Sequence, residues 1–126
     1  GHGETILVVD DEEAIRAVAE RLLRKYSYEV LLAEDGPAAL AVFAEHSAKI
    51  GVIVTDVSMP IMSGVALART LRKMQPDACI IISAGREDDC TPAEMAEIGI
   101  AGTLPKPFTQ TALLRLLDQV MSPNRK

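Results

Sequence analysis

The chain has 126 residues, of which 48% are hydrophobic, and its formal net charge of −5 comes from interspersed acidic and basic residues. These values predict one ordinary domain over residues 1–126 with a real hydrophobic core, and they exclude a disordered chain. Without a basic stripe, a membrane-spanning apolar stretch or a signal peptide, neither direct nucleic-acid binding nor membrane contact is expected, and a cytoplasmic location is predicted.

Short apolar runs alternate along the chain with stretches of helical periodicity, a pattern typical of a parallel sheet with crossover helices. The runs are rich in Val, Ile and Leu, as in strands covered on both faces, and predict strands near 5–9, 29–33, 51–55, 78–83 and 101–104. Helices are predicted after Asp11, from Gly36–Pro37, after Ser63, after Thr91 and after Thr109, the last one ending at 122–124. The predicted fold is α/β, with five strand–helix units, helices on both faces of the sheet and no second domain.

Signals within the helical stretches predict one helix start and the buried helix faces. Thr91, Pro92 and Glu94 form a capping box, which marks a helix N-terminus. Apolar residues at helical spacing predict the inner faces: Ile15, Val18, Ala19, Leu22; Leu40, Phe43, Ala44; Leu67, Leu71, Met74; Leu113, Leu116, Leu117, Val120. Cys79 lies in an apolar run and is predicted to be a core residue, whereas Cys90 lies in a polar stretch. Nothing suggests a disulfide or a zinc site, so a reducing compartment is expected.

Polar side chains lie at the ends of four of the predicted strands. Asp10 and Asp11 follow the first strand and Asp56 follows the third. Ser83 ends the fourth apolar run, and Lys106 comes just past the fifth. Because the carboxyl ends of parallel strands build the site of an open α/β sheet, these five side chains are expected to converge on one rim.

The combination of these groups suits a divalent cation and a phosphoryl group. Two carboxylates about 4 Å apart repel by roughly 4 kcal/mol at an effective dielectric of 20, so three at one rim would raise their pKa values or recruit a cation. Mg²⁺ prefers such oxygen ligands, and the charges of three carboxylates, Lys106 and one Mg²⁺ sum to zero. Asp56 has a second predicted role as a nucleophile that carries an aspartyl phosphate, with Ser83 donating to a phosphoryl oxygen.

Each of these residues, taken singly, has a simpler structural explanation. Asp11 would more often be a helix N-cap, and Asp56 would be a turn residue. Ser83 would be a strand-end hydroxyl bonded to the backbone, and Lys106 a solvated surface lysine. Singly the simpler explanations prevail, but the combination at the ends of four strands favours the functional interpretation.

The motifs of the chain resemble those of the response-regulator receiver domain over about residues 4–121. They are Val8–Glu12, Asp56 followed by Met59–Pro60 and Gly64, Ser83–Ala84, and Lys106–Phe108. The resemblance implies a flavodoxin-like (βα)5 doubly wound sheet with strand order 2-1-3-4-5, which periodicity alone does not give. The segments Gly3–Glu12 and Leu104–Phe108 look most like those of receivers attached to hybrid histidine kinases, with a stand-alone regulator as the alternative.

The resemblance also implies the ligands of the site. Asp56 would be the phosphoacceptor, charged from a phosphohistidine on a sensor histidine kinase or a histidine phosphotransfer protein. Asp11 would bind Mg²⁺ (or Mn²⁺) directly together with Asp56, Asp10 would assist, often through water, and the backbone carbonyl of Ser58 would be the third protein ligand. No other cofactor is implied.

The switch residues implied by the resemblance include one departure from the family. Lys106 would pair with the phosphoryl group, its bond to Pro107 being typically cis in the family, and Ser83 would move toward the phosphate. The family often has an aromatic switch residue three positions before the lysine, but this chain has Thr103 there. A mechanism with a rotating aromatic side chain is therefore not expected.

The expected function is that of a phosphorylation-controlled module in a His–Asp relay, which is not an enzyme acting on external substrates. Its partner surface, and a possible homodimer contact, would be formed by the fourth helix, fifth strand and fifth helix, by family analogy. One alternative is a receiver-like interaction domain that is not phosphorylated. A less favoured one is a Mg²⁺-dependent phosphatase of the haloacid-dehalogenase type, which would carry its nucleophile in an Asp-x-Asp pair at the first strand.

Overall fold

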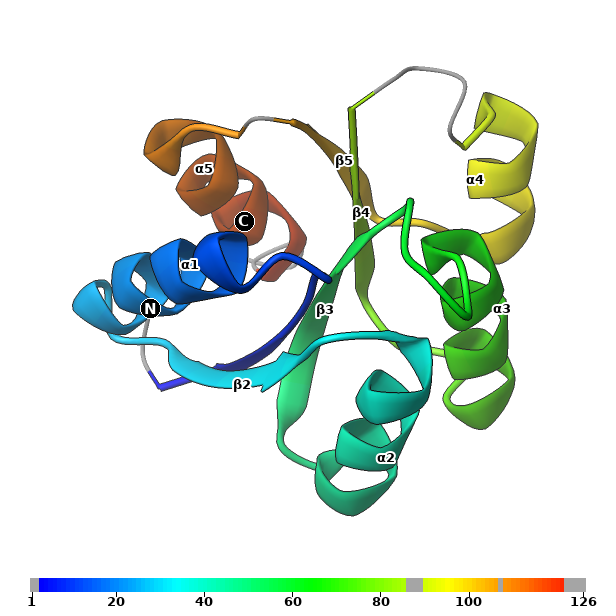
Figure 1. Ribbon diagram of the computed structural model, residues 1–126, viewed down its shortest axis with the longest axis horizontal. Helices are drawn as coiled ribbons and strands as arrows, with labels where there is room; N and C mark the ends of the chain where they lie inside the picture. Colours follow the sequence, from blue (N-terminus) through cyan, green and yellow to red (C-terminus); the bar gives the residue numbers. More distant parts are fainter. Residues whose placement is uncertain (1–2, 86–89, 107, 122–126) are drawn as a thin grey trace.

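The computed structural model describes residues 3–85, 90–106 and 108–121, in which five strands alternate with five helices (Figure 1). The strands are β1 (Thr5–Val9), β2 (Glu29–Ala33), β3 (Ile50–Asp56), β4 (Ile80–Ala84) and β5 (Gly102–Pro105). The helices are α1 (Glu13–Lys25), α2 (Gly36–His46), α3 (Gly64–Met74), α4 (Pro92–Ile98) and α5 (Gln110–Met121). The predicted elements are confirmed to within two residues at their described ends. The bond from Lys106 to Pro107 and the chain at 122–124 lie outside the described residues.

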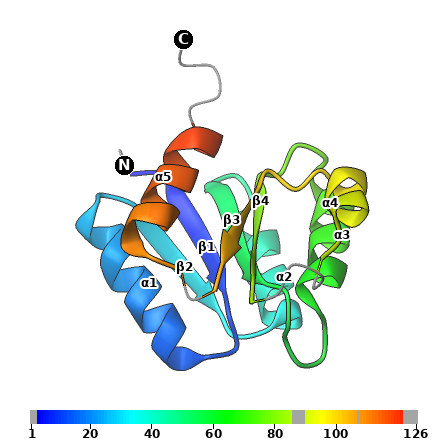
Figure 2. The ribbon, with the colours of Figure 1, turned by 90° about the horizontal axis from the view of Figure 1, so that it is seen from above.

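All neighbouring strands pair in parallel, in the order β2-β1-β3-β4-β5, which confirms the expected topology. Helices α1 and α5 cover one face of the sheet, and α2, α3 and α4 cover the other (Figure 2). Asp56 lies opposite Ser83 in the register of β3 and β4. Among the described residues, none of the helices has the length and apolar character that spanning a bilayer requires.

Alternate residues of each strand enter one of two hydrophobic cores, one on each face of the sheet. Ile6 and Val8 pack with α1 and α5, whereas Leu7 and Val9 pack with α2 and α3. The side chains of the three central strands β1, β3 and β4 are mostly buried on both faces, which explains why these strands read as continuous apolar runs. A sheet covered in this way leaves only its ends free to carry polar groups.

Three residues predicted to lie on buried helix faces are exposed instead. Val18 is 57% exposed, Met74 is 46% exposed, and Ala44 is also exposed. In α1 the buried stripe is centred on Ala19 and Leu23, and Val18 precedes Ala19 by one residue, which turns it about 100° around the helix. The apolar stripe of this helix is therefore narrower than the spacing of its apolar residues suggests.

The two cysteines are buried to the opposite extent from what their surroundings in the sequence suggest. Cys90, from the polar stretch, is only 4% exposed and packs with Val57 and Ile82 in a small third cluster. Cys79, from the apolar run, is half-buried at the position before β4. Thr91, the polar residue that follows Cys90, caps α4 as predicted.

Gly64 allows α3 to start directly against the end of β3. Its backbone N–H donates to the carbonyl of Val57 at 2.7 Å. A Cβ atom at this position would lie 2.2 Å from the carbonyl oxygen of Asp56 and 2.7 Å from the Cα of Val57. Because both of these are backbone atoms, a larger residue would displace the loop after Asp56.

We expect Gly64→Ala to lower the free energy of unfolding by about 1–3 kcal/mol, since the added methyl group forces a backbone shift in a packed region. Urea unfolding followed by circular dichroism measures this. Gly85→Ala is the control, because a Cβ there would have no atom within 4 Å. Equal urea midpoints for the two variants would contradict the close approach at Gly64.

Candidate functional site

The predicted polar residues meet at the carboxyl edge of the sheet. Asp10 directly follows β1, Asp56 is the last residue of β3, Ser83 lies near the end of β4, and Lys106 follows β5. The strand order places β1 next to β3 and β3 next to β4, so these strand ends are neighbours. The backbone N–H of Lys106 donates to the carbonyl of Ala84 at 3.0 Å, which extends the pairing of β4 and β5 to this edge.

Lys106 forms ion pairs with two buried carboxylates. Its Nζ lies 3.1 Å from Oδ2 of Asp10 and 3.1 Å from Oδ2 of Asp56. Burial is the largest single effect on the pKa of Lys106 and lowers it, but the hydrogen bonds and charges of the two carboxylates outweigh it, so the pKa is raised. Lys106 is therefore a fixed ammonium rather than the solvated surface lysine of the simpler explanation.

Asp56 is 5% exposed, and burial raises the pKa of its carboxyl above the ordinary value. The charge of Asp10 acts in the same direction. The hydrogen bond and charge of Lys106, and a hydrogen bond from the backbone N–H of Ser58 to Oδ1 at 3.3 Å, lower the pKa without cancelling the effect of burial. The negative charge of Asp56 is thus only partly compensated, which favours binding of a cation.

Both the carboxylate and the carbonyl of Asp10 have partners, and one of these contacts was not predicted. Its Oδ1 accepts a hydrogen bond from the backbone N–H of Glu12 at 2.9 Å, and its carbonyl accepts one from Nη1 of Arg16 at 2.6 Å. Asp11 is not the N-cap of α1: that position is Glu12, which makes no side-chain cap bond. The sequence offers little signal for Arg16 beyond its place in the helix that follows the acidic pair.

The three carboxylates form a group that fits a small divalent cation. Asp10, Asp11 and Asp56 each offer an oxygen atom, and these atoms lie within 4.8 Å of one another. Asp11 is exposed while the other two are buried, so the group opens toward solvent on one side. Oxygen donors at this spacing suit Mg²⁺, which usually takes one or two protein carboxylates and keeps several waters. No observation points to Mn²⁺.

Among the residues that the structure describes, Ser83 is the one whose buried side chain lacks a hydrogen-bond partner. The residue is 3% exposed, and its Oγ makes no hydrogen bond to any other described residue. A buried hydroxyl in this state costs about 1–3 kcal/mol. Because Ser83 lies opposite Asp56 in the sheet, an acceptor placed on Asp56 is well located to receive its hydrogen bond.

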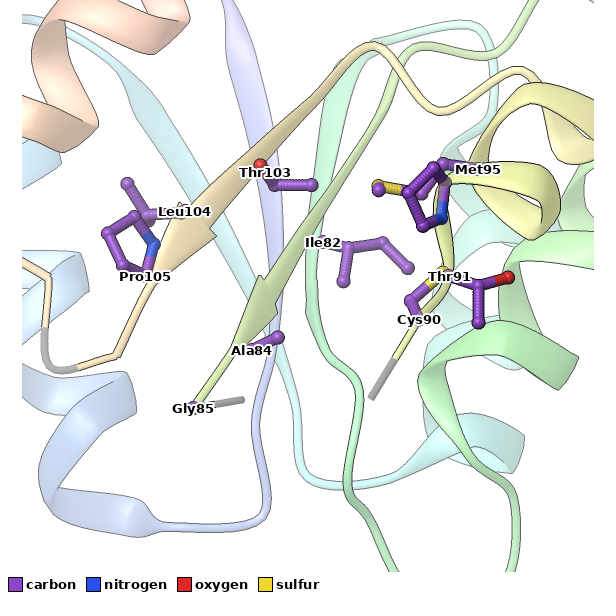
Figure 3. Close-up of a pocket in the computed structure, with 10 residues that line it drawn as sticks. Ile82, Ala84, Gly85, Cys90, Thr91, Met95, Thr103, Leu104 and Pro105 are labelled. Carbon is purple, nitrogen blue, oxygen red and sulfur yellow. The ribbon is translucent and has the colours of Figure 1, made fainter. Parts of the chain in front are cut away.

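A cavity of about 600 Å³ lies on the other side of β4, between this strand, β5 and α4 (Figure 3). Ile82 and Ala84, the neighbours of Ser83, line it together with Met95 and Thr103. Thr103, the residue at the position of the expected aromatic switch, is exposed at this cavity. The cavity is mainly apolar and is separate from the acidic group.

Comparison with known proteins gives a consistent family. The sequence profile of the response regulator receiver domain matches residues 6–118. The chain is 34% identical over 117 residues to the sensor kinase CckA of Brucella abortus (strain 2308), an alignment that covers 93% of this chain and 12% of the kinase. The chain spans less than half the length of the curated relatives that it matches.

Solved structures show the same fold over almost the whole chain. A response regulator receiver domain protein from Clostridium thermocellum superposes with a TM-score of 0.89 at 30% identity, covering 96% of each chain. The response regulator protein TrrA from Thermotoga maritima, solved in complex with Mg²⁺ and BeF, superposes with a TM-score of 0.83 at 29% identity, covering 93% of this chain and 98% of that one.

We expect Asp56→Asn to stabilise the metal-free protein at pH 7. Because the folded-state pKa of Asp56 is raised, the ionised carboxyl destabilises the fold as pH rises from its unfolded value of about 3.9 through the folded value. The gain should therefore shrink as the pH is lowered toward 4. Urea midpoints in the presence of a chelator measure it.

Asp118→Asn is the matched control, since Asp118 is exposed on α5 and loses the same charge. A midpoint for Asp56→Asn that is no higher than that of this control at pH 7 would show that the buried carboxylate carries no such penalty.

Proposed function

The chain belongs to the response regulator receiver family of two-component signalling systems, and we propose that Asp56 is the residue that accepts the phosphoryl group. The observation that carries this proposal is the pairing of the buried, only partly compensated Asp56 carboxylate with Lys106 at 3.1 Å. An Asp56 oxygen attacks phosphorus and forms a P–O bond, while the P–N bond of a phosphohistidine breaks and its electron pair returns to the imidazole.

Each neighbour of Asp56 has a task in this transfer. Asp11, Asp56 and the backbone carbonyl of Ser58 would hold Mg²⁺, and Asp10 would assist through a water molecule. When bound, Mg²⁺ neutralises charge that develops on the phosphoryl oxygens. Lys106 moves its ammonium from the carboxylate of Asp56 to a phosphoryl oxygen, which keeps the total charge of the site low.

Ser83 links the phosphoryl group to the rest of the fold. Its unpaired hydroxyl donates to a phosphoryl oxygen, which removes the cost of leaving it without a partner. A hydrogen bond to a charged group contributes about 1.5–3 kcal/mol, whereas shifting a population from 1:99 to 99:1 requires about 5.5 kcal/mol. Ser83 alone therefore does not complete the switch, and Lys106, the chain at Ala84–Gly85 or a partner supplies the remainder. Because Thr103 stands at the position of the family's aromatic switch residue, no aromatic side chain rotates there.

The partners follow from this chemistry. The donor is a sensor histidine kinase or a histidine phosphotransfer protein, and the chain acts in the cytoplasm as a module of a hybrid kinase or as a stand-alone regulator.

The surface of α4, β5 and α5 contacts the output partner or a second copy. The chain accepts and loses its own phosphoryl group and turns over no external substrate. A non-phosphorylated interaction domain is the less favoured alternative, because all the acids, the lysine and the hydroxyl are present.

We expect acetyl phosphate and Mg²⁺ to add one phosphoryl group to the intact protein, as measured by mass spectrometry. Asp56→Asn or a chelator should abolish the gain, because the first removes the nucleophile and the second the charge that stabilises the transfer. Asp118→Asn should leave it unchanged. A folded wild-type protein whose mass does not change would move the assignment to the non-phosphorylated interaction domain.

Ser83→Ala should still gain the phosphoryl group but show smaller amide chemical-shift changes in α4 on phosphorylation, measured by ¹H–¹⁵N NMR. The reason is that one hydrogen bond to a charged group favours the switched state by about 1.5–3 kcal/mol. Full-size shift changes in this variant would rule out coupling through Ser83.

A further inference from the structure

Arg16 is a residue of α1 to which the proposed function gives no task, although it contacts the site. Its Nη1 donates to the backbone carbonyl of Asp10 at 2.6 Å, and its side chain is half-buried. The donor is a guanidinium, so this is a charge-assisted hydrogen bond, a class roughly twice as strong as neutral ones. The bond ties the first turns of α1 back to the end of β1.

The other contacts of the turn between β1 and α1 hold different atoms: the backbone N–H of Asp10 donates to the carbonyl of Ala33 at 3.2 Å, and the Asp10 carboxylate pairs with Lys106. Glu12, at the N-cap, makes no side-chain cap bond, and the turn is closed by the bond from its backbone N–H to Oδ1 of Asp10. The carbonyl of Asp10 is then held by Arg16 alone among the described residues. Arg16 therefore fixes the orientation of the peptide that joins Asp10 to Asp11.

The orientation of this peptide matters most for Asp11. The Asp11 side chain is exposed and makes no hydrogen bond or ion pair with another described residue, yet its carboxylate lies within 4.8 Å of those of Asp10 and Asp56. Within the described part of the chain, only the backbone of the turn directs the Asp11 carboxylate toward the other two. A rotation of the peptide would remove one of the three oxygen donors from the group.

We propose that Arg16 is a positioning residue for the divalent-cation site, which acts by holding the turn that presents Asp11. This inference rests on the proposed function, since it assumes that the acidic group binds Mg²⁺. Groups behind the direct ligands of a metal typically change its affinity by 10–100-fold when they are removed.

The sign of the effect separates positioning from simple electrostatics. Arg16 carries a positive charge close to the acidic group, so removing that charge should strengthen cation binding if charge were its only influence. Loss of positioning should weaken the binding. The two explanations therefore predict opposite changes in the Mg²⁺ dissociation constant.

The test is a Mg²⁺ titration by isothermal calorimetry and by ¹H–¹⁵N NMR of the wild type, Arg16→Met, Arg16→Lys and Arg21→Met. We expect the dissociation constant to rise about tenfold or more in Arg16→Met and to recover in part in Arg16→Lys, which retains one charged donor. Arg21→Met loses the same charge from an exposed position of α1 and should bind Mg²⁺ as the wild type does or more tightly.

An unchanged or lower dissociation constant in Arg16→Met would overturn the inference. If Arg16→Met does not fold, Arg16→Lys decides: wild-type affinity with wild-type NMR shifts at Asp11 shows that the guanidinium geometry is not needed and also overturns it. A wild-type protein that does not bind Mg²⁺ would instead overturn the metal site of the proposed function, so the two failures are distinguishable.

Discussion

The ammonium of Lys106 lies between two buried carboxylates, and most of the structure at this edge of the sheet depends on that arrangement. Asp10 and Asp56 come from neighbouring strands, and each lies 3.1 Å from the Lys106 nitrogen. Removing the ammonium would leave both buried carboxylates without a counter-charge, a loss that typically costs several kcal/mol. The ends of β1, β3 and β5 must therefore keep their relative positions, because only then does the Lys106 ammonium compensate both carboxylates.

This arrangement also leaves the group two positive charges short of balance. One ammonium faces two buried carboxylates and the exposed Asp11, so the pKa of Asp56 stays raised by its burial. Ser83 adds an unsatisfied hydroxyl beside them. Two costs of folding are thus concentrated at one place, and both are relieved by the same pair of ligands, a divalent cation and an anionic oxygen.

Much of the fold and the centre of the site follow from local rules in the sequence. The apolar runs predict all five strands because strands covered on both faces have no polar alternation, and the capping box at Thr91 predicts the start of α4. Asp56, Ser83 and Lys106 are predictable because strand ends converge in any sheet of this kind.

The features that local rules miss are side-chain contacts, some within the turn between β1 and α1 and some between distant segments. Asp11 is a reasonable N-cap by residue type, but Asp10 takes the hydrogen bond that closes the turn. Arg16 reaches the carbonyl of Asp10 only because α1 packs against the end of β1. The burial of Cys90 depends on how α4 covers β4, which neighbouring polar residues do not reveal. The strand order required the family resemblance, since periodicity carries no information about which strands pair.

Strand β4 separates two unlike compartments, the polar group on one side and the apolar cavity on the other. Ser83 belongs to the first, while its neighbours Ile82 and Ala84 line the second. Thr103 places a small side chain at this cavity, where the family often has an aromatic one. By thermodynamic reciprocity, a molecule that occupied the cavity and changed the affinity of the polar compartment for a cation by some factor would itself bind with an affinity changed by that same factor when the cation is present.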